Sequence, residues 1–177
     1  MKHFDLLEGR HHVWKYNDEI PPKELIENAL WKAWKTTPSK NNAMPYKVFV
    51  YGPEHKAEKV KVWEMVFSNH KDAEVRAVNL GQFTVASGNV DTSAVEVGMF
   101  IQNLSTYLLK EKIDVSYTSC FRRDIKLWHK AGLTHADYRP IMLMSTGYSK
   151  KYRKDVSYIK NGLSDIKPEI NEIVKWI

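Results

Sequence analysis

A long run of helical periodicity constrains the fold more than any other feature of this sequence. Apolar residues recur over 92–110 at the spacing of one helix face, namely Val97, Phe100, Ile101, Leu104 and Leu108. Such a face is stable only when another element covers it. The small residues Ala94 and Gly98 on the same helix would admit a closely packed neighbour, either a helix or a second chain.

Shorter helix and strand patterns alternate along the rest of the chain. Further helices are predicted over 23–35, 54–67 and 124–131. Strands are predicted over 48–51, 83–86, 113–118 and 140–146. This alternation predicts an α+β or α/β layered fold. At 177 residues, the chain is expected to form a single domain over 1–177.

Several classes of protein are excluded by composition. Cys120 is the only cysteine, so no internal disulfide can form and a cytoplasmic location is expected. The longest uncharged runs, 77–90 and 97–109, are shorter than the roughly 18–20 residues of a membrane span. We therefore expect no membrane partner. The apolar tail over 167–177 must pack on its own domain or on a partner subunit.

Positive charge is concentrated in the second half of the chain. The net charge is +6, and residues 110–160 hold 12 basic and 5 acidic side chains. Such an excess suits an anionic partner, which could be nucleic acid, a phosphorylated cofactor or an acidic membrane. It also suits an ordinary solvated surface.

Two basic segments are candidates for binding an anion. Arg10, His11 and His12 precede the first predicted helix, and guanidinium and imidazole groups bind phosphate well. Four cations lie within 150–154, just after the strand that ends at Gly147. No glycine-rich phosphate loop is present, so side chains would have to hold any phosphate. The histidines match no zinc signature, and no metal is expected.

Two other segments carry polar or reactive groups. The loop over 38–46 places hydroxyl and amide side chains between two prolines, where they could hold a planar polar ligand. It also reads as a simple helix-to-strand connection. Cys120 precedes two arginines that could lower its pKa, although a small residue in a turn explains it equally.

Taken in order, these segments resemble the nitroreductase family of flavin enzymes. RHHVWKYNDEIPPKELIENALWKAWKTTPSKNNAMPYKVFVY is similar to the family's opening, which is a basic motif, a helix, a PSSxNxQPW loop and a strand. VEVGMFIQNLSTYLLKEKIDVSYTSCF resembles the central helix and the strand after it. LWHKAGL and RPIMLMSTGYSKKYRK resemble the last sheet strand and the basic residues that follow.

The resemblance implies an α+β, three-layer fold with a mostly antiparallel central sheet flanked by helices, in an intertwined homodimer. It implies an FMN-dependent oxidoreductase, a flavoprotein in which NAD(P)H reduces the flavin by hydride transfer. The flavin then reduces a nitroaromatic, a quinone or a similar small-molecule acceptor in ping-pong fashion. No catalytic side chain is implied, because flavin N5 carries the hydride.

Motif positions also imply which residues bind the cofactor. Arg10, His11 and His12 would hold the FMN phosphate or ribityl chain, and Lys151 and Arg153 would close on the same phosphate. Pro38, Ser39, Lys40 and Asn42 would reach the flavin from the other subunit. Ser119 and Cys120 would lie near the ring edge.

The chain departs from the family pattern at several of these positions. His12 replaces a serine, Lys40 replaces the second serine of the loop, and Met44 replaces its glutamine. These changes bear on substrate range more than on flavin binding. Two alternatives stay open: a flavin-destructase-like or otherwise specialised flavin enzyme of the same fold, and a non-catalytic flavin-binding or nucleic-acid-binding protein.

Overall fold

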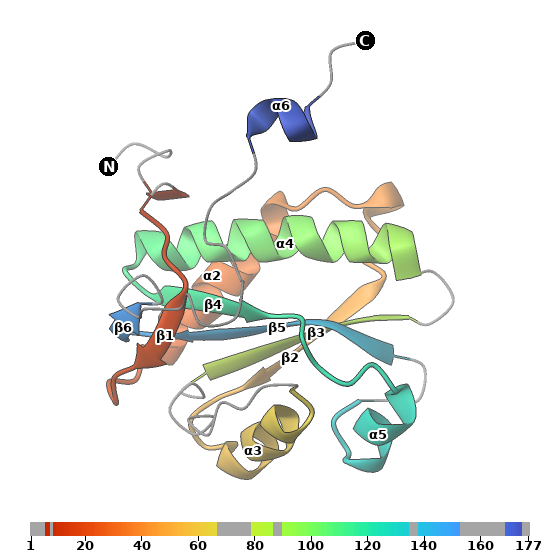
Figure 1. The fold of residues 1–177 in the computed structure, drawn as a ribbon, viewed down its shortest axis with the longest axis horizontal. Helices are drawn as coiled ribbons and strands as arrows, with labels where there is room; N and C mark the ends of the chain where they lie inside the picture. The colour runs from red at the N-terminus through yellow and green to blue at the C-terminus, as the bar shows by residue number, and fades with distance from the viewer. Residues whose placement is uncertain are drawn as a thin grey trace.

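A four-stranded antiparallel sheet lies at the centre of the computed structural model, which describes residues 6–7, 9–66, 79–86, 90–134, 138–152 and 169–174. Its strands lie side by side in the order β2-β3-β5-β4 (Figure 1). They are β2 (Tyr46–Tyr51), β3 (Asn79–Ala86), β4 (Asp114–Thr118) and β5 (Tyr138–Gly147). Each pattern predicted as a strand is found here, with longer bounds for β2, β3 and β5.

Helices cover both faces of this sheet and give the molecule three layers (Figure 1). One face is covered by α2 (Lys23–Thr36) and α4 (Val90–Lys110). The other is covered by α3 (Lys56–Glu64) and α5 (Ile125–Lys130). The predicted α+β class, with an antiparallel central sheet flanked by helices, is confirmed.

The core is divided in two by the sheet, because successive side chains of a strand point to opposite faces. Met144 of β5 packs with α2 and α4, whereas its neighbour Leu143 packs with α3 and α5. The apolar face predicted for α4 lies in the first of these clusters, where all five of its residues are buried. Gly98 on this helix is exposed, and a Cβ built there would meet no atom within 4 Å. The expectation of a close neighbour at Gly98 is therefore not met within the described chain.

A second, two-stranded sheet joins distant parts of the chain. Its strands are β1 (Val13–Tyr16) and β6 (Ser149–Tyr152), which pair antiparallel. Neither was predicted from the sequence. β1 also contacts β4, which is the edge strand of the central sheet. Two short helical turns complete the described elements, η1 (Lys40–Asn42) and α6 (Ile170–Ile173).

Within the described ranges, no helix combines the length and the apolar character needed to cross a bilayer.

Candidate functional site

The pairing of β1 with β6 brings the two predicted anion-binding segments together. Lys15 of β1 lies opposite Lys151 of β6, and Val13 lies opposite Tyr152. Arg10, His11 and His12 lead directly into β1. The backbone pairing thus places a lysine position of each strand beside the other. The described part of the chain ends at Tyr152 here, so the predicted Arg153 lies outside it.

Arg10 is held against the central sheet by an aromatic ring. Its guanidinium carbon lies 5.3 Å from the centre of the Tyr117 ring, in β4. The Tyr117 hydroxyl in turn bonds to the buried Ser105 hydroxyl of α4. A guanidinium held over an aromatic ring has N–H donors around its plane that can bind an anion. Arg10 is thus oriented by β4 and α4 while it stays partly accessible.

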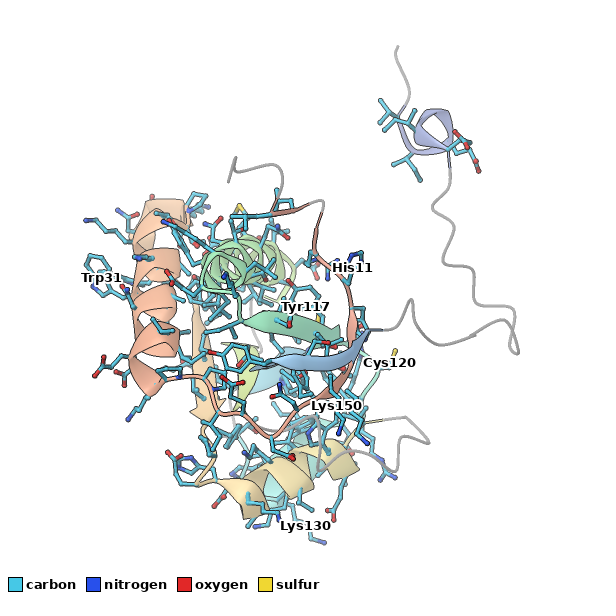
Figure 2. The ribbon with its side chains drawn as sticks, turned by 90° about the vertical axis from the view of Figure 1, so that its left-hand side faces the viewer. His11, Trp31, Tyr117, Cys120, Lys130 and Lys150 are labelled. Atoms are coloured by element: carbon cyan, nitrogen blue, oxygen red, sulfur yellow. The ribbon has the colours of Figure 1, made fainter. Side chains whose placement is uncertain are left out.

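The histidines lie beside the same edge strand. The His12 ring contacts the Ser116 hydroxyl of β4, with Nε2 at 3.1 Å from Oγ. His11 is partly buried next to it. At the start of β4, Asp114 accepts a 2.9 Å hydrogen bond from the Ser149 backbone N–H. This bond connects the start of β6 to β4. His11, Tyr117 and Lys150 lie on one side of the molecule in Figure 2, opposite the side that carries Trp31.

The predicted ring-edge residues follow the end of β4. Ser119 and Cys120 are both exposed, and Cys120 is a free thiol. Figure 2 shows Cys120 on the same side as His11 and Lys150. No interaction between this thiol and the basic segments is seen among the described residues. The described residues also contain no cluster of three His, Cys, Asp or Glu side chains that could bind a metal.

The other predicted half of the site is the loop between α2 and β2. Pro38, Lys40 and Asn42 are exposed, and Ser39 is partly buried. The Ser39 hydroxyl donates a 2.7 Å hydrogen bond to Glu96 Oε2 of α4. This loop is therefore attached to α4 through Ser39, and it exposes backbone groups and polar side chains to solvent.

A buried carboxylate next to this loop also affects Tyr46. Burial, and secondly the negative charge of Glu96, raise the pKa of Tyr46 to about 12. Its hydroxyl therefore stays protonated at neutral pH, and it donates to the Met44 sulfur at 2.9 Å. Met44, which replaces the glutamine of the family motif, thus contacts Tyr46.

An apolar hollow of about 430 Å³ lies beside the loop, and we call it the Trp31 groove. It is lined by Leu30, Trp31, Trp34, Met44, Tyr46, Val48 and Phe100. Trp31 and Trp34 are 54% and 56% exposed, which is unusual for the two largest side chains of α2.

Within one chain, the two halves of the predicted site are attached to different parts of α4. The loop is bound at Glu96, and Arg10 reaches the helix through Tyr117 at Ser105. Nine residues of helix, at about 1.5 Å each, separate these points by about 13 Å. In Figure 1, β1 lies by the end at which α4 finishes. The single chain does not bring Pro38–Asn42 into contact with Arg10.

Three residues of this region were missed from the sequence. Tyr117 and Ser116 support Arg10 and His12, and Glu96 holds the loop. Only Glu96 leaves a signal, because a charged glutamate next to Val97 falls on the face of α4 that carries the predicted apolar residues. Tyr117 and Ser116 look like ordinary strand residues.

The sequence matches no protein-family model and no curated protein. Solved structures, in contrast, do match the fold of this chain. A nitroreductase family protein from Streptococcus pneumoniae TIGR4 superposes with a TM-score of 0.76 at 14% identity, covering 99% of this chain and 100% of that one. A Staphylococcus epidermidis protein assigned as an NAD(P)H:FMN oxidoreductase gives 0.80 at 13% identity, covering 99% and 96%.

The chain has the nitroreductase fold. A Desulfovibrio desulfuricans protein assigned as a nitroreductase and solved in complex with FMN gives a TM-score of 0.76 at 14% identity. It covers 100% of this chain and 98% of the other. The nitroreductase fold thus accounts for nearly the whole chain, and the resemblance seen in the sequence is borne out at the level of structure.

Proposed function

We propose that this protein is an FMN-dependent oxidoreductase of nitroreductase type. The observation that carries the proposal is the pairing of β1 with β6, which gathers Arg10, the two histidines and Lys151 along one edge of the sheet. The nitroreductase fold supports it, since one solved neighbour contains FMN and another is assigned as an NAD(P)H:FMN oxidoreductase.

The residues at this edge fit the phosphate end of FMN. A phosphate dianion needs several charge-assisted hydrogen bonds, and guanidinium, imidazole and ammonium groups provide them. Arg10 is oriented by Tyr117, and His12 by Ser116. In our proposal, Arg10, His11, His12 and Lys151 bind the phosphate and ribityl chain, joined by Arg153.

The flavin ring would be held between two copies of the chain. Because Pro38, Ser39, Lys40 and Asn42 do not reach Arg10 within one chain, we assign them to the flavin of a partner subunit. Two apolar surfaces that are exposed in the described part of the chain support a homodimer. One is the Trp31 groove, and the other is α6, whose Ile170 and Ile173 are 74% and 68% exposed.

The chemistry that FMN supplies is acceptance and release of a hydride at its ring. The chain's own residues bind the cofactor, orient its ring and leave one face open for NAD(P)H and then for a nitroaromatic or quinone acceptor. Ser119 and Cys120, beyond the end of β4, would lie at the ring edge. No side chain is assigned an acid or base role.

Flavin titration of the purified protein tests the proposal. We expect FMN to bind more tightly than riboflavin, which lacks the phosphate. Arg10→Ala should weaken FMN binding by about 10- to 100-fold, the loss expected for hydrogen bonds to a charged group, and change riboflavin binding little. Lys130→Ala, an exposed cation on α5, is the control. Absence of FMN binding, or equal binding of both flavins, would refute the proposal.

A stopped-flow experiment tests the reaction. The FMN-loaded protein is mixed with NADH or NADPH and then with a nitroaromatic or a quinone. We expect the visible flavin absorbance to bleach when the nicotinamide reduces the flavin. The absorbance should recover when the acceptor is added, with about one acceptor reduced per flavin. Permanent loss of flavin would instead favour flavin breakdown. Binding of nucleic acid that weakens steeply with salt, without flavin binding, would favour the non-catalytic alternative.

A further inference from the structure

The loop between α2 and β2 has a backbone that needs external support. Asn41, Asn42 and Met44 have positive φ angles of 56°, 54° and 44°. Asparagine tolerates this left-handed region, but a long side chain such as methionine is unfavourable there. Backbone of this kind persists only where its surroundings impose it. A group outside the loop must therefore hold this backbone conformation.

Glu96 of α4 contacts the loop through both of its carboxylate oxygens. Oε2 accepts a hydrogen bond from the Ser39 hydroxyl at 2.7 Å, and Oε1 accepts one from the Lys40 backbone N–H at 3.0 Å. The Ser39 hydroxyl also accepts from the Met44 backbone N–H at 2.9 Å. One carboxylate thus fixes the start of the loop directly and its strained end through Ser39.

The surroundings of Glu96 indicate a specific role. Glu96 as a whole residue is only 4% exposed, and burying a carboxylate is costly unless hydrogen bonds compensate. Among the described side chains, no Lys or Arg nitrogen lies within 4.0 Å of it. The loop's own donors therefore take the place that a cation would usually occupy. A second link, from Asn103 Nδ2 to Thr37 Oγ1 at 3.1 Å, holds only the end of α2.

We propose that Glu96 is a positioning residue that holds loop 38–45 in the conformation that receives the flavin. The inference rests on the proposed function, because it takes FMN as the ligand of this loop. Glu96 itself is buried beneath the loop and acts through Ser39 and Lys40. Those residues, with Pro38 and Asn42, present the surface that meets the ring.

Glu96→Gln and Ser39→Ala test the proposal. A glutamine has the same shape but only one acceptor oxygen, so its NH₂ group must face one of the two donors. Each variant should weaken FMN binding by about tenfold, as measured by flavin fluorescence. The double variant should lose little more than either single one, because both variants disturb the same hydrogen bond between Ser39 and Glu96. Asp91→Asn, which removes an exposed carboxylate from the same helix, should bind FMN like wild type.

Hydrogen exchange without flavin gives a second readout. The amides of Lys40 and Met44 should exchange at least about tenfold faster in both variants, while amides of the central sheet stay unchanged. Unchanged FMN affinity and unchanged exchange would overturn the inference. If wild-type protein binds no FMN, the proposed function fails, and the role of Glu96 towards a flavin fails with it. If wild type binds FMN and the variants bind it equally well, only the role of Glu96 is overturned.

Discussion

Gly147 lies where the ring of Tyr16 leaves no room for a side chain. A Cβ at this position would come within 2.8 Å of the buried Tyr16 ring. The Tyr16 hydroxyl holds that ring in place, because it donates a 2.8 Å hydrogen bond to the Ser145 carbonyl. Gly147→Ala should therefore lower the free energy of unfolding by about 1–3 kcal/mol, because the ring must shift in a packed core. Urea unfolding followed by circular dichroism measures this change.

Gly98→Ala is the matched control. Gly98 lies within α4 and faces open space, so alanine should raise the stability by about 0.5–1 kcal/mol through better helix propensity. Opposite signs for the two substitutions are the expected result. Equal stability of Gly147→Ala and wild type would contradict the tight contact with Tyr16.

At the level of single residues, the sequence predicted the basic residues of the candidate site but not the residues that orient them. Arg10 and His12 were found because basic residues before a first helix match a known motif, and the structure shows them oriented by β4. Their partners Tyr117 and Ser116 are distant in sequence and have no distinctive type. Such supports depend on tertiary contacts, which local patterns do not encode. Whether Arg10 and His12 bind FMN stays a prediction.

The short helix α5 depends on its first residue for stability. Asp124 precedes it, and its carboxylate accepts a 2.9 Å hydrogen bond from the Lys126 backbone N–H. The helix carries Trp128, whose buried ring meets Phe121 edge-on with centres 5.4 Å apart. Asp124→Ala should lower the unfolding free energy by about 1 kcal/mol, and Asp124→Asn, which keeps the cap, much less. Denaturant unfolding of both variants distinguishes them, and equal losses would contradict the cap.

Long elements were predictable and short ones were not. The periodicity of α4 and α2 spans several turns, and the structure confirms both helices within two residues at each end. β1 and β6 have four residues each and contain one or two lysines, so no alternation marks them as strands. They form because β1 pairs with β6 beside the edge strand β4. This pairing joins residues that are far apart in the sequence.

At the scale of the whole molecule, the proposed homodimer predicts a change of mass when the Trp31 groove is made polar. A Trp31→Glu, Trp34→Glu variant should shift from dimer to monomer in size-exclusion chromatography with light scattering, because two charges would be buried at the contact. FMN binding should weaken with it, since the site would lose its second half. Val60→Glu on α3, in the opposite layer, is the control. A dimer that survives in the tryptophan variant would show that this groove is not the interface.

The union of β1 with β6 also has a consequence for biosynthesis. Tyr16 leaves the ribosome early, whereas its partner Ser149 is among the later residues to be translated. β1 and β6 can pair only after all of the polypeptide between them has emerged, and their pairing carries the entropic cost of joining distant segments. In the proposed function, FMN should therefore bind after translation, and nascent chains arrested before Ser149 should not retain it.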